Sequence, residues 1–267
     1  MLGAIAGDII GSCFEWEPIK TTDFELFSPV SHYTDDTVLT VAVAYSLLED
    51  LGYAESLKIF GNNYEAGYGS SFYAWLASAS LEPYNSWGNG SAMRVSPVAY
   101  AFNSVEEVLE EAKNSALVTH NHPEGIKGAQ AVALAIFLAR TGSTKQVVKE
   151  EISSRFGYDL DRTLEEIRPD YAFEVSCQKS VPESIICFLE SYDYEEAVRN
   201  AVSLGGDSDT MACIAGSIAE AFYGLPDEIA ESTLERLPPE FIEILDRFKE
   251  KYQGFYKINH GEFLLKK

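Results

Sequence analysis

The sequence predicts an all-α fold, a single compact multi-helix domain, from two kinds of helical signal. Three Ala-rich stretches are apolar around most of a helical circumference, as central helices of a bundle are: residues 37–48, 128–139 and 211–222. Two further segments have the patterns of peripheral helices: a capping box at Ser104 and Glu107 before residues 105–116, and an apolar stripe at Phe241, Ile244, Leu245 and Phe248. No fixed-period repeat or flexible linker divides the chain, so we expect residues 1–267 to form one domain.

From the amino terminus, the first helical signal is a glycine pattern. Gly3, Gly7 and Gly11 recur every four residues and would line one helix face, where a second backbone can approach closely. Membrane helices use this spacing to dimerise, but the apolar segment 2–10 is too short to span a bilayer and contains Asp8. No Lys or Arg precedes it, so we do not expect a signal peptide.

Two later segments are less regular. Residues 37–48 contain several valines, which keeps a strand possible, but their length favours a helix. Residues 156–182 show no clear periodicity and contain Pro169, Pro182 and several acidic residues. We expect them to form an irregular insertion or cover.

The charge balance excludes some classes of function. The chain has 20 Lys and Arg against 42 Asp and Glu, a formal net charge of −22. Such a protein repels polyanions at long range, which disfavours nonspecific binding to nucleic acids or anionic membranes. Its four cysteines show neither metal-ligand spacing nor a disulfide pattern, which fits a reducing compartment. We therefore expect a soluble, cytoplasmic protein without a membrane segment.

Two acidic motifs stand directly before two of the apolar helices. Thr34, Asp35 and Asp36 precede one, and residues 207–210, Asp-Ser-Asp-Thr, precede the other. Each motif alone has a purely structural explanation, since acidic residues and threonine stabilise helix N-termini. The second motif is not an EF-hand, because the glycine and the twelfth-position glutamate of that loop are absent.

Together the two motifs indicate a metal centre. The helices should pack side by side, which brings four carboxylates and the hydroxyls of Thr34 and Thr210 to one place. Four such charges repel strongly unless cations lie between them, and two divalent cations carry the balancing charge. Ligation by oxygen alone favours Mg²⁺ or Mn²⁺ over zinc.

Two glycine-containing loops and a histidine pair are candidate ligand contacts. Residues 86–90 carry two glycines before a helix that should begin near Ser91, so their N–H groups could surround an anion. Residues 67–69 form a weaker example, and either loop could simply be a turn. His120 and His122 lack the i, i+4 spacing of a helical metal pair. For these histidines we expect a substrate contact rather than zinc, with helix capping as the alternative.

With these motifs in hand, the chain resembles the ADP-ribosylglycohydrolase family, which includes the dinitrogenase-reductase-activating glycohydrolase. The matching segments occur in order and span most of the chain: residues 7–15, 33–37, 67–69, 86–94, 119–120 and 205–210. The opening motif and the two aspartate motifs are specific in this order. The short glycine turns add little individually.

The resemblance implies an all-α fold with a central metal-containing cleft holding two Mg²⁺ or Mn²⁺ ions. It implies metal ligation by Thr34, Asp35, Asp36, Asp207, Asp209 and Thr210. Glu15 and Asp36 would be the catalytic carboxylates, with Glu15 beside the scissile bond. The substrate would be held by Gly67, Gly69, Ser86, Trp87, Gly88, Asn89, Gly90, Met93, Arg94 and His120.

The expected function is a metal-dependent hydrolase that cleaves the glycosidic bond at ribose C1″ and releases ADP-ribose from a protein side chain or a small acceptor. Two other classes remain open: a non-catalytic ADP-ribose binder or structural protein, and a dinuclear-metal phosphohydrolase. Two residues also keep a second interpretation. Glu15 could be a solvated surface residue, and Arg94 could belong to a buried ion pair instead of contacting the diphosphate. The acceptor is not specified by the sequence.

Overall fold

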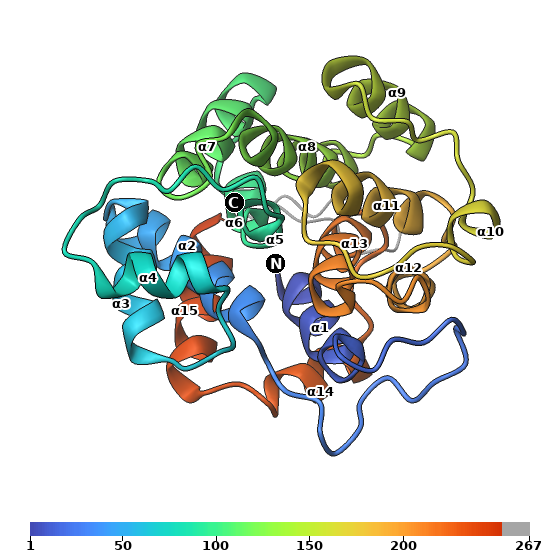
Figure 1. Cartoon of the computed structure of the whole chain (residues 1–267), viewed down its shortest axis with the longest axis horizontal. Coiled ribbons are helices and arrows are strands. Elements are labelled where there is room, and N and C mark those ends of the chain that lie inside the picture. The colour runs from blue at the N-terminus through green and yellow to red at the C-terminus, as the bar shows by residue number, and fades with distance from the viewer. Residues whose placement is uncertain (253–267) are drawn as a thin grey trace, which may run out of the picture.

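Residues 1–252, the part of the chain that this computed structural model describes, contain helices and no strand (Figure 1). The helices are α1 (Leu2–Gly11), the 3₁₀ helix η1 (Ser12–Phe14), α2 (Asp35–Glu49), α3 (Tyr53–Asn63), α4 (Ser70–Ala77), α5 (Gly90–Met93), α6 (Ser96–Ala101), α7 (Val105–Leu117), α8 (Pro123–Arg140), α9 (Lys145–Phe156), α10 (Leu164–Ile167), α11 (Cys177–Leu189), α12 (Tyr194–Ser203), α13 (Ser208–Tyr223), α14 (Asp227–Leu234) and α15 (Pro239–Tyr252). The predicted all-α class is confirmed.

The glycine face of α1 packs directly on α13. A Cβ atom placed on Gly7 would lie 2.1 Å from the carbonyl oxygen of Ala212, and one on Gly11 would lie 2.5 Å from the Cα of Asp209. No side chain fits in such spaces, so the glycines let the two backbones touch. This close contact confirms the predicted helix approach, and it brings the carboxyl end of α1 against the beginning of α13.

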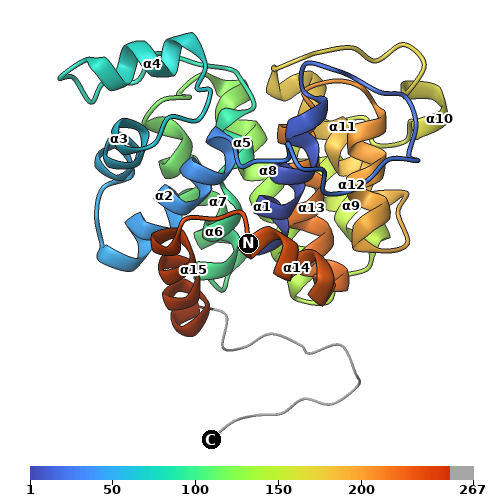
Figure 2. The ribbon, with the colours of Figure 1, turned by 90° about the horizontal axis from the view of Figure 1, so that it is seen from below.

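The three apolar stretches are confirmed as buried helices, α2, α8 and α13. In both ribbon views α1 and α13 lie in the middle, with α2, α3, α4 and α15 on one side and α9 to α12 on the other (Figures 1 and 2). Each of α2 and α13 begins at one of the acidic motifs. The packing of the core therefore decides where those carboxylates meet.

The predicted peripheral helices also form. In α7 the Ser104 hydroxyl accepts from the Glu107 N–H at 3.2 Å while the Glu107 carboxylate accepts from the Ser104 N–H at 3.1 Å. In α15 the stripe that begins at Phe241 faces the core. The sequence analysis did not anticipate α3, α4, α6, α9, α12 and α14. No described helix is long and apolar enough to span a membrane.

The expectation for residues 156–182 is partly wrong. The segment contains the short α10, and its last residues already belong to α11, which carries Pro182 inside it. The proline lacks the N–H that would donate to the Gln178 carbonyl. The hydroxyls of Ser180 and Ser184 donate to other carbonyls, those of Ser176 and Ser180, each at 2.8 Å, so they do not replace the missing bond. Buried apolar residues of α11 keep the helix in place despite the proline.

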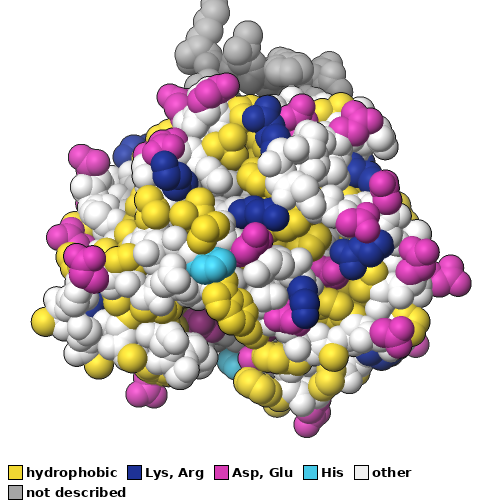
Figure 3. Space-filling model, turned by 45° about the horizontal axis from the view of Figure 1, so that its top comes forward, with side chains coloured by type: hydrophobic (Ala, Val, Ile, Leu, Met, Phe, Trp, Pro, Cys, Tyr) yellow, Lys and Arg dark blue, Asp and Glu magenta, His cyan; other side chains and the backbone are white. Residues whose placement is uncertain are grey.

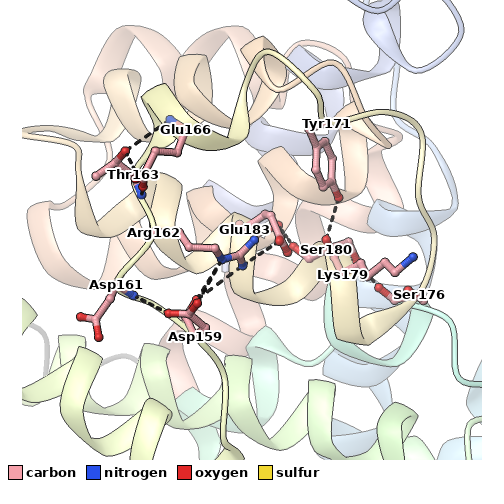
Figure 4. A network of polar contacts seen from close by, with 11 residues as sticks. Asp159, Asp161, Arg162, Thr163, Glu166, Tyr171, Ser176, Lys179, Ser180 and Glu183 are labelled. Carbon is pink, nitrogen blue, oxygen red and sulfur yellow. Dashed lines mark hydrogen bonds and ion pairs between the residues drawn. The ribbon is translucent and has the colours of Figure 1, made fainter.

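The irregular part of this segment is fastened to α11 (Figure 4). Arg162 forms an ion pair of 2.8 Å with the buried Glu183, and the Tyr171 hydroxyl donates to the Lys179 carbonyl at 2.9 Å. The irregular part of the segment therefore has defined contacts with α11, and its role as a cover stays a prediction. Residues 253–267 lie outside the described part of the chain, so one domain over 1–267 stays a prediction.

Candidate functional site

Carboxylates from three separate segments converge at one end of the core. Oxygen atoms of Asp8, Asp36 and Asp209 lie within 4.8 Å of one another, and so do oxygen atoms of Glu15, Asp207 and Asp209. The structure thus brings together four residues that the sequence analysis selected, from η1, α2 and α13. It adds Asp8, which the sequence analysis did not select.

Asp8 fastens the first turn of α2 to α1. Its carboxylate accepts from the Thr34 N–H at 3.0 Å, the Thr34 hydroxyl at 2.7 Å and the Thr37 N–H at 3.1 Å, and it also accepts from the Thr37 hydroxyl. Thr34 in turn caps α2 by accepting from the Asp36 N–H at 3.3 Å. A charged residue inside an otherwise apolar helix was the sequence signal for Asp8.

The two threonines of the acidic motifs orient their neighbours. The Thr210 hydroxyl donates to Asp36 Oδ2 at 3.1 Å, and the Thr210 N–H donates to Asp209 Oδ1 at 2.9 Å. The other oxygen of Asp36, Oδ1, is buried and has no hydrogen-bond partner among the described residues. A buried carboxylate oxygen without a partner is energetically unfavourable unless a ligand satisfies it.

The electrostatics of the cluster favour protonation. Burial, and after it the charge of Asp209, raises the pKa of Asp8 to about 7. The same two causes raise the pKa of Glu15 to about 7, and the pKa values of Asp36 and Asp207 well above the usual aspartate range. Carboxylates this close can all be ionised only when cations compensate them.

Asp35 occupies a more open position than the other aspartates. It is only half-buried and belongs to neither of the two close carboxylate groups. It still interacts with them, because burial followed by the charges of Asp209 and Asp8 raises its pKa. Asp35 thus lies at the edge of the cluster.

The loop of residues 86–90 lies against the cluster. The Asn89 side-chain amide donates to Asp207 Oδ2 at 2.7 Å, which joins the predicted substrate loop to a predicted metal ligand. Behind the loop, α5 places Met93 next to the second motif, with its sulfur 3.9 Å from the Thr210 hydroxyl. The structure therefore brings the two predicted subsites into contact.

The loop differs in detail from the expected ring of free N–H groups. The Gly88 N–H donates to the Ser86 hydroxyl at 3.1 Å, and the Asn89 N–H donates to the Val175 carbonyl at 2.8 Å. These two donors are therefore engaged within the protein. Neither Gly88 nor Gly90 has a positive φ angle. Gly90 is instead constrained by His120, whose Nε2 would lie 3.1 Å from a Cβ atom at that position.

The structure does not support a direct contact between Arg94 and a diphosphate. The Arg94 side chain is completely buried, and its Nη2 donates to the Ser115 carbonyl at 3.1 Å and to the Thr119 hydroxyl at 2.7 Å. Its other nitrogens, Nε and Nη1, have no hydrogen-bond partner among residues 1–252. The alternative of an ion pair is not observed there either, so Arg94 is a buried cation behind the loop.

The remaining candidates occupy different places. His120 is buried beside the loop, whereas His122 caps α8 by accepting from the Glu124 N–H at 3.1 Å, the alternative that the sequence left open. Trp87 is about half exposed, at 48%. Gly67 and Gly69 are exposed in the turn before α4, where Gly67 has a φ of +78°. Tyr68 between them is near enough to Asp35 for that charge, after burial, to raise the pKa of the tyrosine.

Comparisons with known proteins agree with this geometry. A model of the family described as ADP-ribosylglycohydrolase matches residues 1–256. The chain is 29% identical to the human protein "ADP-ribosylhydrolase ARH3", covering 87% of this chain and 86% of that one. It is 23% identical to "ADP-ribosylarginine hydrolase Tri1" of Pseudomonas putida, over 91% and 72% of the two chains.

A solved structure shows the same fold. It is titled "ADP-ribosylglycohydrolase-related protein complex", superposes with a TM-score of 0.73 at 23% identity, and the match covers 94% of this chain and 95% of that one. The family model extends over both acidic motifs, the loop of residues 86–90 and Glu15. The chain therefore belongs to the ADP-ribosylglycohydrolase family.

Proposed function

We propose that the protein is a metal-dependent hydrolase that cleaves the glycosidic bond at ribose C1″ and releases ADP-ribose from a modified protein side chain or a small acceptor. The observation that carries this proposal is the buried carboxylate cluster, joined through Asn89 to the loop of residues 86–90. Membership of the family supports the reaction class.

The residues of the cluster fit two divalent cations. All the donor atoms are oxygens, and Asp36 Oδ1 lacks a partner among the described residues. Mg²⁺ or Mn²⁺ prefers such ligands. The residues proposed to hold the ions are Thr34, Asp35, Asp36, Asp207, Asp209 and Thr210. When bound, the cations would balance the carboxylate charges and orient the ribose hydroxyls.

Glu15 is the proposed acid or base at the scissile bond. It follows η1, is half-buried, and is not among the proposed metal ligands, although one of its oxygens lies within 4.8 Å of oxygens of Asp207 and Asp209. Burial and then the charges of Asp209 and Asp8 raise the pKa of Glu15 to about 7, so it can hold or release a proton near neutral pH. Glycosidic cleavage passes through an oxocarbenium-like transition state that requires such a carboxylate and a positioned water molecule.

The surface supports a modified protein or small conjugate as substrate rather than a nonspecific nucleic acid. On the face shown in Figure 3, Asp and Glu side chains are spread widely and interspersed with Lys and Arg. The formal net charge of −22 repels polyanions at long range. All four cysteines are free, which fits the proposed cytoplasmic location.

The test is incubation with a panel of defined substrates, with and without Mg²⁺ or Mn²⁺. The panel contains arginine-linked and serine-linked ADP-ribosyl peptides and O-acetyl-ADP-ribose, and the products are separated chromatographically. We expect ADP-ribose to form only with the metal. AMP would indicate a phosphohydrolase, and binding of ADP-ribose without any product would indicate a non-catalytic binder.

A further inference from the structure

A buried chain of hydrogen bonds leads from Arg94 to His120. Arg94 Nη2 lies 2.7 Å from the Thr119 hydroxyl oxygen, which lies 2.8 Å from His120 Nδ1. Arg94 and Thr119 are completely buried, and the histidine is 5% exposed. These hydrogen bonds therefore lie in the protein interior, away from bulk water. In that environment the direction of each hydrogen bond matters.

The donor and acceptor types restrict that direction. A guanidinium group can only donate, so the Thr119 oxygen accepts from Arg94 and keeps its single proton for another bond. The Thr119 hydroxyl has two further neighbours, His120 Nδ1 and the Tyr84 hydroxyl. A protonated Tyr84 can itself donate to the Thr119 oxygen, which leaves the Thr119 proton for His120 Nδ1. A neutral imidazole whose Nδ1 accepts carries its own proton on Nε2.

The surroundings keep the ring neutral. Burial, and after it the positive charge of Arg94, lowers the pKa of His120 well below its usual range. The neighbouring ring of Tyr84 lies 6.0 Å away between centroids, and burial raises the pKa of Tyr84 to about 12. Tyr84 therefore remains protonated and brings no negative charge that would favour a doubly protonated histidine.

The protonated edge of the ring faces the substrate loop. Nε2 would lie 3.1 Å from a Cβ atom on Gly90 and 3.8 Å from one on Gly88. No larger side chain therefore fits between the loop and this nitrogen. The Nε2 proton is thus presented at residues 88–90, where two of the backbone donors are already engaged.

We propose that Arg94 and Thr119 are positioning residues that hold His120 as the neutral Nε2–H tautomer, so that this N–H donates to an oxygen of bound ADP-ribose at residues 88–90. The identity of the acceptor rests on the proposed function, whereas the tautomer does not. Arg94 thus serves ADP-ribose binding through two intervening residues and never touches it.

The first test reads the tautomer in the protein without metal or ligand. Heteronuclear NMR of the ¹⁵N-labelled histidines, with His120 assigned by loss of its signals in His120→Gln, distinguishes a protonated from an unprotonated ring nitrogen. We expect His120 to show a protonated Nε2 and an unprotonated Nδ1 in the wild type and in Thr119→Ser. In Thr119→Val, which keeps the shape but lacks the hydroxyl, we expect the Nδ1–H form to appear.

The second test measures binding and turnover. We expect Thr119→Val to weaken ADP-ribose binding about tenfold, equivalent to about 1.4 kcal/mol, and to raise KM with little change in kcat. Thr119→Ser should stay within about twofold of the wild type, the scale of a small packing change. Ser115→Ala is the matched control, because it removes a buried hydroxyl beside Arg94 that bonds only to the Ala112 carbonyl.

The outcomes separate the two proposals. A wild-type His120 with its proton on Nδ1, which would place the Thr119 proton on Tyr84 instead, overturns the inference. So does a Thr119→Val variant whose tautomer and ADP-ribose affinity are unchanged, or a Ser115→Ala variant that reproduces its effects. A wild-type protein that binds no ADP-ribose contradicts the proposed function, while the NMR spectra still decide the tautomer.

Discussion

At the scale of single residues, the site depends on carboxylates that would be unfavourable anywhere else in the fold. Asp36 is buried beside Asp209, and one of its oxygens has no partner among residues 1–252; Glu15 stands at the edge of the same cluster. Removing one negative charge and removing one proton-transfer group should therefore have different effects. Amide substitutions that keep the side-chain shape test this difference.

Glu15→Gln should leave ADP-ribose affinity intact and lower turnover by roughly 10²-fold or more, the usual scale for a positioned acid or base. The amide occupies the same space but cannot exchange a proton. Single-turnover kinetics on the best substrate of the panel, together with calorimetric titration of ADP-ribose, measures both effects. An unchanged rate would assign Glu15 to a solvated face.

Asp36→Asn or Asp209→Asn should remove most of one metal site, because each replaces a charged ligand by a neutral one. The same change relieves repulsion between buried carboxylates, so the variants should melt at a higher temperature than the wild type when EDTA is present. Calorimetric titration with Mg²⁺ and thermal unfolding with EDTA measure the two effects. A wild type that binds no Mg²⁺ or Mn²⁺ at millimolar concentration would contradict the metal proposal.

At the scale of helices, the close contact of α1 with α13 sets the separation between Asp8 and Asp209. Any side chain on the glycine face of α1 pushes the two helices apart and moves both carboxylates. This makes the glycines part of the site's geometry although none of them touches a ligand. Helix propensity alone would predict the opposite effect for a glycine-to-alanine change.

Gly7→Ala should destabilise the protein by about 1–3 kcal/mol or more, the range for overpacking a core, despite the better helix propensity of alanine. The added Cβ would lie 2.1 Å from the Ala212 carbonyl oxygen. Urea unfolding measures the loss. Gly52→Ala is the control, because a Cβ there meets only the Glu55 side chain, at 3.4 Å and beyond. Equal stability of the two variants would mean that α1 and α13 are not in backbone contact.

Helices also differ in how well their local sequence predicts them. Helix α2 could be predicted because a capping threonine, acidic residues and a long apolar run all favour the same local structure. Acidic residues and a long apolar run predict α13 in the same way. Helix α11 begins in a segment expected to be irregular, because Pro182 suggests a helix boundary. The helix continues through the proline because its residues are buried in the core, which the local sequence does not show. The sequence left two roles open for Arg94 for a related reason: its burial depends on neighbours distant in sequence.

At the scale of the whole molecule, the carboxylate cluster couples stability to pH. A group whose pKa is higher in the folded than in the unfolded chain stabilises the folded state fully when the pH is below its pKa in the unfolded chain. That stabilisation disappears as the pH rises through its pKa in the folded chain. For Asp8 the window runs from its ordinary value of 3.8 to about 7. The metal-free protein should therefore lose stability as pH rises across this window.

The melting temperature in EDTA should fall between pH of about 5 and 7.5 as the buried carboxylates ionise, and saturating Mg²⁺ should reduce or reverse the fall by compensating their charges. Differential scanning calorimetry with EDTA and with Mg²⁺ measures both curves. Asp36→Asn should show a shallower fall in EDTA. A wild-type melting temperature that rises with pH in EDTA would mean that the cluster does not control stability in this range.

The hydrogen bond between Asn89 and Asp207 has a thermodynamic consequence. The carboxylate that receives the Asn89 amide is also a proposed metal ligand, so occupancy of one subsite changes the free energy of filling the other. Such linkage is reciprocal: whatever factor the cation contributes to ADP-ribose affinity, ADP-ribose must contribute to cation affinity. The affinity for the product and the affinity for the metal would then both depend on one coupling free energy, which the Asn89 amide transmits between the two subsites.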